Sequence, residues 1–320
     1  MRDPGRNLAV EVVTMNDSYD VVIVGGGAAG LSAALVLGRA RRRVAVVDAG
    51  EPRNAPAAAL HGFLSRDGMA PADLLAAGRR EVTGYGVEII EDKVLTAEPG
   101  STAEPGFTVR LAGGRVLTAR QLLVTTGLRD ELPDIPGLTE RWGDDVVACP
   151  YCHGYEVRDQ PLGVVASGAM AAMKALLVRN WSADVVLFPG TDPLAPEDAD
   201  RLAARGIRVE PGEVTRVVAA DGKVTGVEVA GRTVPRTALF VQPEFVPADT
   251  LLRDLGCEVT EQGWVRADRT GATSVPGVWA AGNVVDPMAQ LISAAGAASV
   301  AAGMINHELV LADAEDALAA

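Results

Sequence analysis

The sequence is short of several features, and each shortage narrows what the chain can be. Only three cysteines occur among 320 residues, at Cys149, Cys152 and Cys257, which excludes a disulfide scaffold. No apolar run reaches the roughly 18 residues that a membrane span needs, and the first residues lack the apolar stretch of a signal peptide. We therefore expect a cytoplasmic protein in which a disulfide is more often catalytic than structural.

Positive charge is also scarce. Lysine and arginine together number 29 against 42 acidic residues, so the net charge is −13. Such a protein repels phosphate backbones, and we expect no nucleic-acid partner. Aromatic residues make up 4%, whereas 48% of the residues are hydrophobic, which is ample for two cores. Residues 1–16 precede the first predicted strand and are predicted to form a disordered leader.

The first fifty residues carry the pattern of a dinucleotide-binding unit. Residues 19–24 form a short apolar run typical of a buried parallel strand, 29–39 favour a helix of small residues, and 43–48 favour a second strand. Between the first strand and the helix lies the turn Gly25-Gly26-Gly27-Ala28-Ala29-Gly30. The order of strand, glycine turn, helix, strand and acidic residue is the complete fingerprint of a dinucleotide-binding unit.

Each residue of this fingerprint has a physical role. Gly25 makes the tight turn, Gly27 lets the backbone approach a pyrophosphate, and Gly30 lets the helix pack closely on the strand. The helix N-terminus stabilises phosphate charge. Asp48 ends the second strand and can accept a hydrogen bond from a ribose hydroxyl.

The same architecture recurs after residue 160, and the chain then returns to the first unit. Residues 160–190 read as strand, small-residue turn, helix and strand, while 263–310 give short strands and a long helix. We predict an α/β fold of two Rossmann-like dinucleotide-binding domains of the three-layer ββα type. The first domain is discontinuous, with residues 17–130 and 249–320, and the second spans 131–248.

The stretch Cys149-Pro150-Tyr151-Cys152-His153 has three possible chemistries. The pattern Cys-x-x-Cys-His attaches c-type haem, two cysteines and a histidine can belong to a zinc site, and Cys-x-x-Cys beside a βαβ unit can be a redox dithiol. Haem attachment requires export, and the sequence shows no export signal. A closed zinc site requires four ligands, and the sequence has no second paired motif that would supply the other two. A dithiol is favoured, no metal is expected, and Cys257 is expected to be inert.

These features together resemble the low-molecular-weight thioredoxin reductases, FAD-dependent enzymes of the class II pyridine nucleotide-disulfide oxidoreductases. The resemblance covers residues 17–310 and is carried by the first glycine turn, Thr126-Gly127, the Cys-x-x-Cys and residues 275–291. It implies FAD as cofactor and a homodimer. The implied FAD-binding residues are Gly25, Gly26, Gly27, Ala28, Ala29, Gly30, Asp48, Arg53, Asn54, His61, Val94, Thr126, Gly127, Gly282, Asn283, Asp286, Gln290 and Leu291. The family usually has Asp where Asn283 stands.

The second domain departs from this family. Where thioredoxin reductases have Gly-Gly-Gly-x-x-Ala, the sequence reads Ser167-Gly168-Ala169-x-x-Ala172, and we expect the added Cβ atoms to obstruct a pyrophosphate. Where they have His-Arg-Arg, it reads Pro189-Gly190-Thr191. Loss of two guanidiniums removes charge-assisted bonds of about 1.5–3 kcal/mol each, which makes NADPH binding doubtful.

This combination looks like the thioredoxin reductase-like dithiol oxidases that close disulfides in natural products such as holomycin, gliotoxin and romidepsin. The resemblance implies that a small-molecule dithiol is oxidised by a Cys149–Cys152 disulfide, with electrons passing to FAD and then to O₂, giving H₂O₂. Cys149 is implied as the outer, exchanging sulfur and Cys152 as the one nearer the flavin. His153, which replaces an Asp of thioredoxin reductases, is a candidate acid/base, and Asp286 is a weaker candidate for orienting it.

Two alternatives stay open. The first is a thioredoxin reductase-like enzyme fed by NADPH, ferredoxin or another donor. The second is a non-catalytic flavin-binding redox sensor, although that reading does not explain why both cysteines are present.

Overall fold

The computed structural model describes residues 17–101 and 106–320, which fall into two compact units. Unit 1 comprises residues 17–52, 74–128 and 247–320, and unit 2 comprises 53–73 and 129–246. The predicted leader at 1–16 lies outside the described residues. The segment 53–73, which was assigned from the sequence to the first domain, is grouped in the structure with unit 2.

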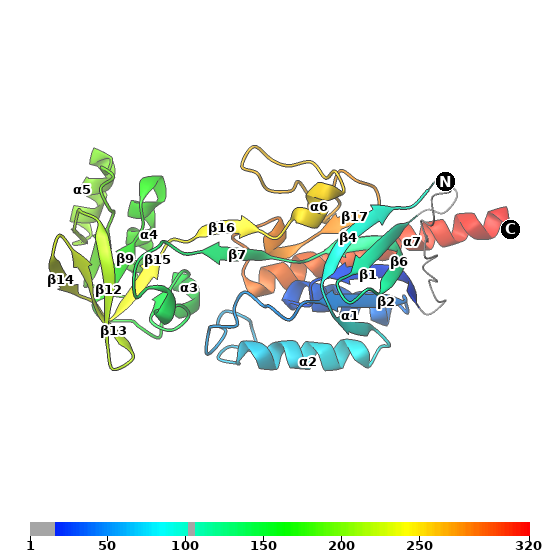
Figure 1. The fold of residues 1–320 in the computed structure, drawn as a ribbon, viewed down its shortest axis with the longest axis horizontal. Coiled ribbons are helices and arrows are strands. Elements are labelled where there is room, and N and C mark those ends of the chain that lie inside the picture. The colour runs from blue at the N-terminus through cyan, green and yellow to red at the C-terminus, as the bar shows by residue number, and fades with distance from the viewer. Residues whose placement is uncertain (1–16, 102–105) are drawn as a thin grey trace, which may run out of the picture. The chain divides into compact units, whose positions relative to one another are not determined.

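A seven-stranded sheet forms the centre of unit 1, in the order β3-β2-β1-β6-β5-β4 with β17 beside β6 (Figure 1). The strands β1, β2, β3, β6 and β17 are parallel, and β4, β5 and β6 run antiparallel to one another. The apolar run predicted at 19–24 is almost entirely buried, as a parallel strand covered on both faces must be. The strands are β1 (Ser18–Val24), β2 (Val44–Asp48), β3 (Glu88–Glu91), β4 (Val94–Pro99), β5 (Phe107–Leu111), β6 (Val116–Val124) and β17 (Val278–Ala280).

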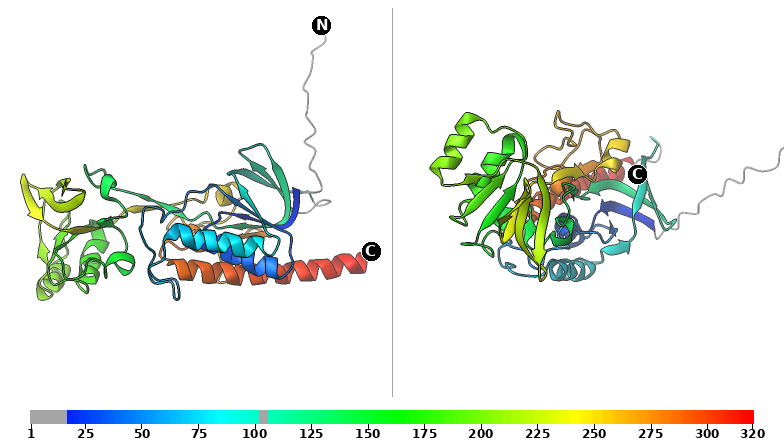
Figure 2. Two further views of the ribbon diagram at one scale, coloured as in Figure 1. Left: turned by 90° about the horizontal axis from the view of Figure 1, so that it is seen from below. Right: turned by 60° about the vertical axis from the view of Figure 1, so that its left-hand side comes forward.

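Two long helices cover one face of this sheet. Helix α1 (Ala28–Arg39) and helix α7 (Leu291–Ala319) lie side by side, and α2 (Pro71–Thr83) runs next to α1 (Figure 2). Alanines such as Ala33, Ala298 and Ala302 are fully buried where the helices meet, so their small side chains let the backbones approach closely. The other face is covered by the antiparallel strands and the segment around α6 (Thr250–Asp254). A 3₁₀ turn, η4 (Gly282–Val284), precedes α7.

Unit 2 is built around a parallel five-stranded sheet in the order β11-β10-β9-β15-β8. Helices α4 and α5 pack on one face, and the antiparallel sheet β12-β13-β14 packs on the other. Strands β7 and β16 pair with each other where the chain passes between units. The elements are β7 (Leu128–Glu131), η2 (Thr139–Arg141), β8 (Val146–Val147), α3 (Pro150–His153), β9 (Leu162–Val165), η3 (Gly168–Met170), α4 (Ala171–Val178), β10 (Val185–Phe188), α5 (Pro196–Ala204), β11 (Arg208–Val209), β12 (Val214–Ala220), β13 (Lys223–Val229), β14 (Arg232–Pro235), β15 (Ala238–Val241) and β16 (Glu244–Pro247).

Unit 1 thus has its glycine turn between β1 and α1 of a mixed sheet, and unit 2 has a corresponding small-residue turn between β9 and α4 of a parallel sheet. The predicted fold class is confirmed. The predicted register of the second turn is wrong by one residue. Strand β1 ends at Val24 and β9 ends at Val165. Counted from these ends, the positions of Gly25, Gly27 and Gly30 are taken by Ala166, Gly168 and Ala171, not by Ser167, Ala169 and Ala172.

The corrected register changes which positions of the second turn carry a Cβ that could obstruct the pyrophosphate of NADPH. The close-approach position keeps its glycine: Gly168 has a φ of 66°, and a Cβ built on it would meet nothing within 4 Å. The added Cβ atoms stand instead at the tight-turn position, Ala166, and at the helix-packing position, Ala171. A 3₁₀ turn also separates Gly168 from α4, whereas α1 begins directly after Gly27.

Candidate active site

The two cysteines of the Cys-x-x-Cys lie at the beginning of the short helix α3. Cys149 is the extended residue that precedes the helix, and Pro150 occupies the first turn, where a missing N–H costs nothing. The Cys152 amide donates to the Cys149 carbonyl at 3.2 Å, which turns both side chains to the same side. Their Sγ atoms are 2.6 Å apart, and both residues are half-buried. The pair can thus close to a disulfide with little movement.

His153 follows the dithiol on α3, and its imidazole is enclosed. Both ring nitrogens are buried, and neither has a hydrogen-bond partner of good geometry among the described residues. Burial lowers the pKa of His153 below its ordinary value, and nearby His61 lowers it further, whereas the Cys149 carbonyl and the Glu156 carboxylate act in the opposite direction. His153 is therefore neutral at pH 7 and has a nitrogen free to accept a proton.

The long loop 53–73 contributes a second histidine to unit 2. The His61 ring lies between two carboxylates, with Nδ1 3.3 Å from Asp67 Oδ2 and Nε2 3.5 Å from Glu156 Oε1. Backbone hydrogen bonds between Leu60 and both Gly68 and Met69 close the part of the loop that carries His61. His61 thereby belongs to the same electrostatic neighbourhood as His153.

An arginine of the same loop, Arg53, pairs with Asp130 of strand β7. The Arg53 guanidinium donates to both carboxylate oxygens of Asp130, at 2.8 and 2.7 Å, and stacks over the Phe245 ring. Asn54 lies one residue further and accepts the Ala57 amide with its backbone carbonyl. Arg53, Asn54 and His61 thus lie in unit 2, and their predicted FAD contacts stay predictions.

Lys174 is a charged residue of the site that sequence reasoning missed. It projects from α4, and its Nζ donates to the backbone carbonyl of Val241 at 2.6 Å. Burial lowers its pKa to about 8, while the charges of Cys149 and Asp130 act to raise it. The available signal was its placement: it is one of three lysines in the chain and stands inside the otherwise apolar helix "AAMKALLV".

The glycine turn of unit 1 forms an open cradle. Gly27 precedes α1 with no side-chain cap, and a Cβ built there would meet nothing within 4 Å. The first N–H groups of the helix therefore face open space, as a pyrophosphate requires. Gly30 has the opposite role, since its Cβ would lie 1.9 Å from the Gly25 carbonyl oxygen. Buried Thr125, not predicted as a site residue, donates its hydroxyl to that carbonyl at 2.9 Å.

A second group of predicted residues lies against this cradle. A Cβ on Gly282, whose φ is 81°, would lie 3.2 Å from the Cβ of Ala29, so the turn before α7 lies next to the start of α1. Asn283 donates its amide to the carbonyls of Asp286 and Ala289 and shapes the turn. Gln290 and Leu291 then begin α7, whose N-terminus points into the same region. Further along, Thr126 donates to the Ala248 carbonyl at 2.6 Å, and Gly127 has a positive φ of 73°.

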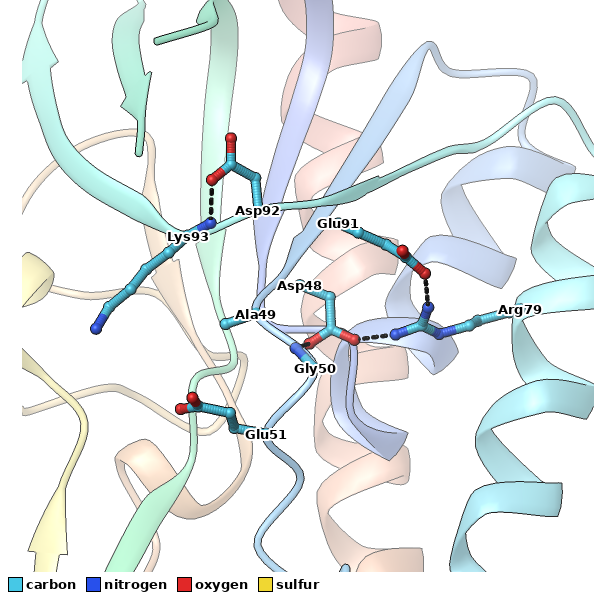
Figure 3. A pocket seen from close by; sticks show the side chains of 8 residues that line it. All are labelled: Asp48, Ala49, Gly50, Glu51, Arg79, Glu91, Asp92 and Lys93. Atoms are coloured by element: carbon cyan, nitrogen blue, oxygen red, sulfur yellow. Dashed lines mark hydrogen bonds and ion pairs between the residues drawn. The ribbon is translucent and has the colours of Figure 1, made fainter. Parts of the chain in front are cut away.

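The carboxyl end of β2 opens into a pocket of about 410 Å³ (Figure 3). Asp48 lies at its centre, where its carboxylate accepts the Gly50 amide and pairs with Arg79 of α2. Arg79 also donates to Glu91, and Lys93 lines the opposite wall beside Val94, the first residue of β4. The location is where the fingerprint places an adenosine ribose. The glycine cradle, the two helix N-termini and this acid-lined pocket fit FAD.

Comparison with known proteins agrees with this geometry. The family model described as pyridine nucleotide-disulphide oxidoreductase matches residues 19–299. The chain belongs to this family. Thioredoxin reductase tcpT of Claviceps purpurea (strain 20.1) is 32% identical over 283 residues, which cover 85% of this chain and 88% of that protein. The crystal structure of HlmI is 55% identical with a TM-score of 0.92, covering 96% and 97% of the two chains. An oxidoreductase from Agrobacterium tumefaciens is 38% identical with a TM-score of 0.85, covering 92% and 99%.

The protein is thus a thioredoxin reductase-like disulphide oxidoreductase of an FAD-binding family, and the predicted resemblance and cofactor are confirmed. In the described part of this disulphide oxidoreductase, no helix is long and apolar enough to cross a membrane. Nor do three or more His, Cys, Asp or Glu residues gather there in a way that could hold a metal ion. Cys257 is buried in the core of unit 1, and burial raises the pKa of its thiol.

Proposed function

We propose that this disulphide oxidoreductase is a dithiol oxidase that closes a disulfide in a small molecule and passes the electrons to O₂. The observation that carries the proposal is the pairing of an exchange-competent dithiol with a nucleotide-binding turn that lacks positive charge. The Cys149 and Cys152 sulfurs are 2.6 Å apart, whereas the residues after β10 are Pro189, Gly190 and Thr191. The residue pattern of the natural-product dithiol oxidases, with its Cys-Pro-Tyr-Cys-His-Gly stretch, supports the same substrate class.

The chain's own residues perform the sulfur chemistry. A substrate thiolate attacks Cys149 of the Cys149–Cys152 disulfide, forms a mixed disulfide and releases the Cys152 thiolate. The second substrate thiol then attacks the substrate sulfur bound to Cys149, which forms the product disulfide and leaves Cys149 as a thiolate. Neutral His153 takes up the proton that each thiol must lose, because burial lowers its pKa and leaves the imidazole neutral at pH 7. When bound, FAD would supply the two-electron acceptor for the reduced Cys149–Cys152 pair, with O₂ as the proposed final acceptor and H₂O₂ as its product.

The environment after β10 supports an electron source other than NADPH. Thioredoxin reductases hold the 2′-phosphate with charged side chains at this place, and Pro189, Gly190 and Thr191 carry none. Gly190 has a φ of 72°, a conformation that an arginine would adopt only with strain. The backbone here is thus built for glycine, and the substrate dithiol is the proposed electron donor. The cytoplasm, where small thiols are kept reduced, is the proposed location.

The test is an oxygen-electrode assay of the purified FAD-loaded protein with a panel of small dithiols. We expect one O₂ consumed and one H₂O₂ formed per disulfide, and loss of at least about a thousandfold in kcat in Cys149→Ser and in Cys152→Ser. Cys257→Ser is the matched control and should keep full activity. Anaerobic mixing with micromolar NADPH should leave the flavin oxidised. Rapid bleaching by NADPH would favour a reductase, and absence of turnover with every dithiol would favour a redox sensor.

A further inference from the structure

Arg79 of helix α2 lines the pocket at the carboxyl end of β2 and binds two carboxylates there (Figure 3). Its Nη2 donates to Asp48 Oδ2, and its Nη1 donates to Glu91 Oε1 at 3.1 Å. The side chain of Glu91 is 81% exposed, whereas that of Asp48 is 14% exposed. Because solvent screens an exposed ion pair, Asp48 is the carboxylate that Arg79 chiefly holds.

Asp48 is held on a second side by the glycine turn of unit 1. A Cβ built on Gly26 would lie 2.6 Å from Asp48 Oδ2, so the carboxylate rests directly against the Gly26 backbone. Its other oxygen, Oδ1, accepts the Gly50 amide at a long 3.4 Å. A carboxylate has about four lone-pair sites, so Asp48 can accept ribose hydroxyls while it keeps these partners. Gly26 and Arg79 thus leave the carboxylate little freedom to turn.

The charge of the pocket explains why Asp48 needs a cation to hold it. Four carboxylates and two cations line the pocket, and they belong to Asp48, Glu51, Glu91, Asp92, Arg79 and Lys93. Carboxylates gathered in one pocket repel one another. The ion pair with Arg79 counters this repulsion at Asp48, the residue that the fingerprint assigns to the ribose.

We infer that Arg79 is a positioning residue for FAD: its guanidinium fixes Asp48 in the orientation in which the carboxylate accepts the ribose hydroxyls of the adenosine. The ribose carries no charge, so Arg79 favours its binding through Asp48 and not by attracting it directly. This role ends when position 48 no longer carries a carboxylate. The inference concerns cofactor affinity alone, which is measured without a dithiol, so its outcome is independent of the proposed function.

The test is a double-mutant cycle on FAD affinity. The FAD-loaded protein is diluted in steps, free FAD is separated by ultrafiltration, and Kd is obtained from the bound fraction. We expect Arg79→Met to raise Kd about tenfold, because Asp48 loses its charge-assisted partner. Asp48→Asn should raise Kd by at least as much. Arg79→Met added to Asp48→Asn should change Kd by less than about twofold, because no carboxylate is left to position.

Two variants separate positioning from charge. Arg80→Met removes an equal charge from the next residue of α2, which is exposed and is not among the residues that line the pocket. It should leave Kd within about twofold of the parent. Arg79→Lys keeps the charge but lacks the forked guanidinium, and it should raise Kd about threefold.

Thermal denaturation with excess FAD shows whether each variant is folded. If Arg79→Met does not fold, the same cycle is run with Arg79→Lys, whose threefold effect should vanish in the Asp48→Asn background. An unchanged Kd in Arg79→Met, or an effect of Arg79 that persists in full without the Asp48 carboxylate, would overturn the inference.

Discussion

His153 shows how one side chain acquires its role from burial instead of from its residue type. An exposed imidazole titrates near 6.5 and would be partly protonated in the cytoplasm. Burial moves its pKa down, so the neutral base dominates at every pH above that lowered value. The base is lost as pH falls through the lowered pKa, and the acid limb of kcat/KM for dithiol oxidation should therefore lie below pH 6.5.

Two neighbours of His153 should shift this limb in opposite directions. His61→Asn removes a group that lowers the His153 pKa, and the acid limb should move to higher pH. Glu156→Gln removes a group that raises it, and the limb should move to lower pH. The measurement is kcat/KM against pH for a dithiol that titrates outside this range, with His153→Gln as the variant that should lose the limb. Equal shifts of the same sign in both variants would contradict the assignment.

At the scale of elements, the glycine turn and the dithiol helix differ in how far the sequence predicts them. The turn was predictable because every residue of the fingerprint is local: Gly25 and Gly30 meet within one strand–helix connection. Cys149, Cys152 and His153 were predictable for the same reason. Lys174 was not, because its hydrogen bond to the Val241 carbonyl joins residues far apart in the sequence, and no short pattern records such a contact.

The register of the second glycine turn was also beyond what the sequence could predict. Its existence was predicted, but its register was set one residue late, because a run of apolar and small residues does not mark where β9 ends. The grouping of residues 53–73 with unit 2 follows from contacts such as Arg53 with Asp130. Such contacts join residues far apart in the chain.

Two glycine-to-alanine changes test the close packing of α1 on its turn. Gly30→Ala puts a Cβ 1.9 Å from the Gly25 carbonyl oxygen, and we expect loss of bound FAD together with destabilisation of about 2 kcal/mol or more. Gly303→Ala, on an exposed face of α7, meets nothing within 4 Å and should stabilise the protein by about 0.5–1 kcal/mol. Thermal denaturation and the FAD content per chain are the measurements. A Gly30→Ala protein with normal FAD content and stability would refute this account of the turn.

At the scale of the whole molecule, the net charge of −13 acts on any charged substrate. An anionic dithiol approaches a negative protein against repulsion, which salt screens with a Debye length of about 30 Å at 0.01 M and about 8 Å at 0.15 M. We expect kcat/KM for a dicarboxylate dithiol to rise severalfold over this range, while that of uncharged dithiothreitol stays constant. Oxygen-electrode assays at fixed pH check this. A parallel response of both substrates would show that the net charge does not govern approach.

The grouping of residues 53–73 with unit 2 has a consequence for connectivity. The chain passes from one unit to the other after residues 52, 73, 128 and 246, so four covalent links join units that two links would suffice to connect. Any rearrangement between the units has to be accommodated at all four links at once. A single backbone cut between residues 53 and 73 would interrupt the first pair and leave the second intact. The nicked molecule would stay in one piece, with the dithiol and the FAD cradle still joined through residues 128 and 246.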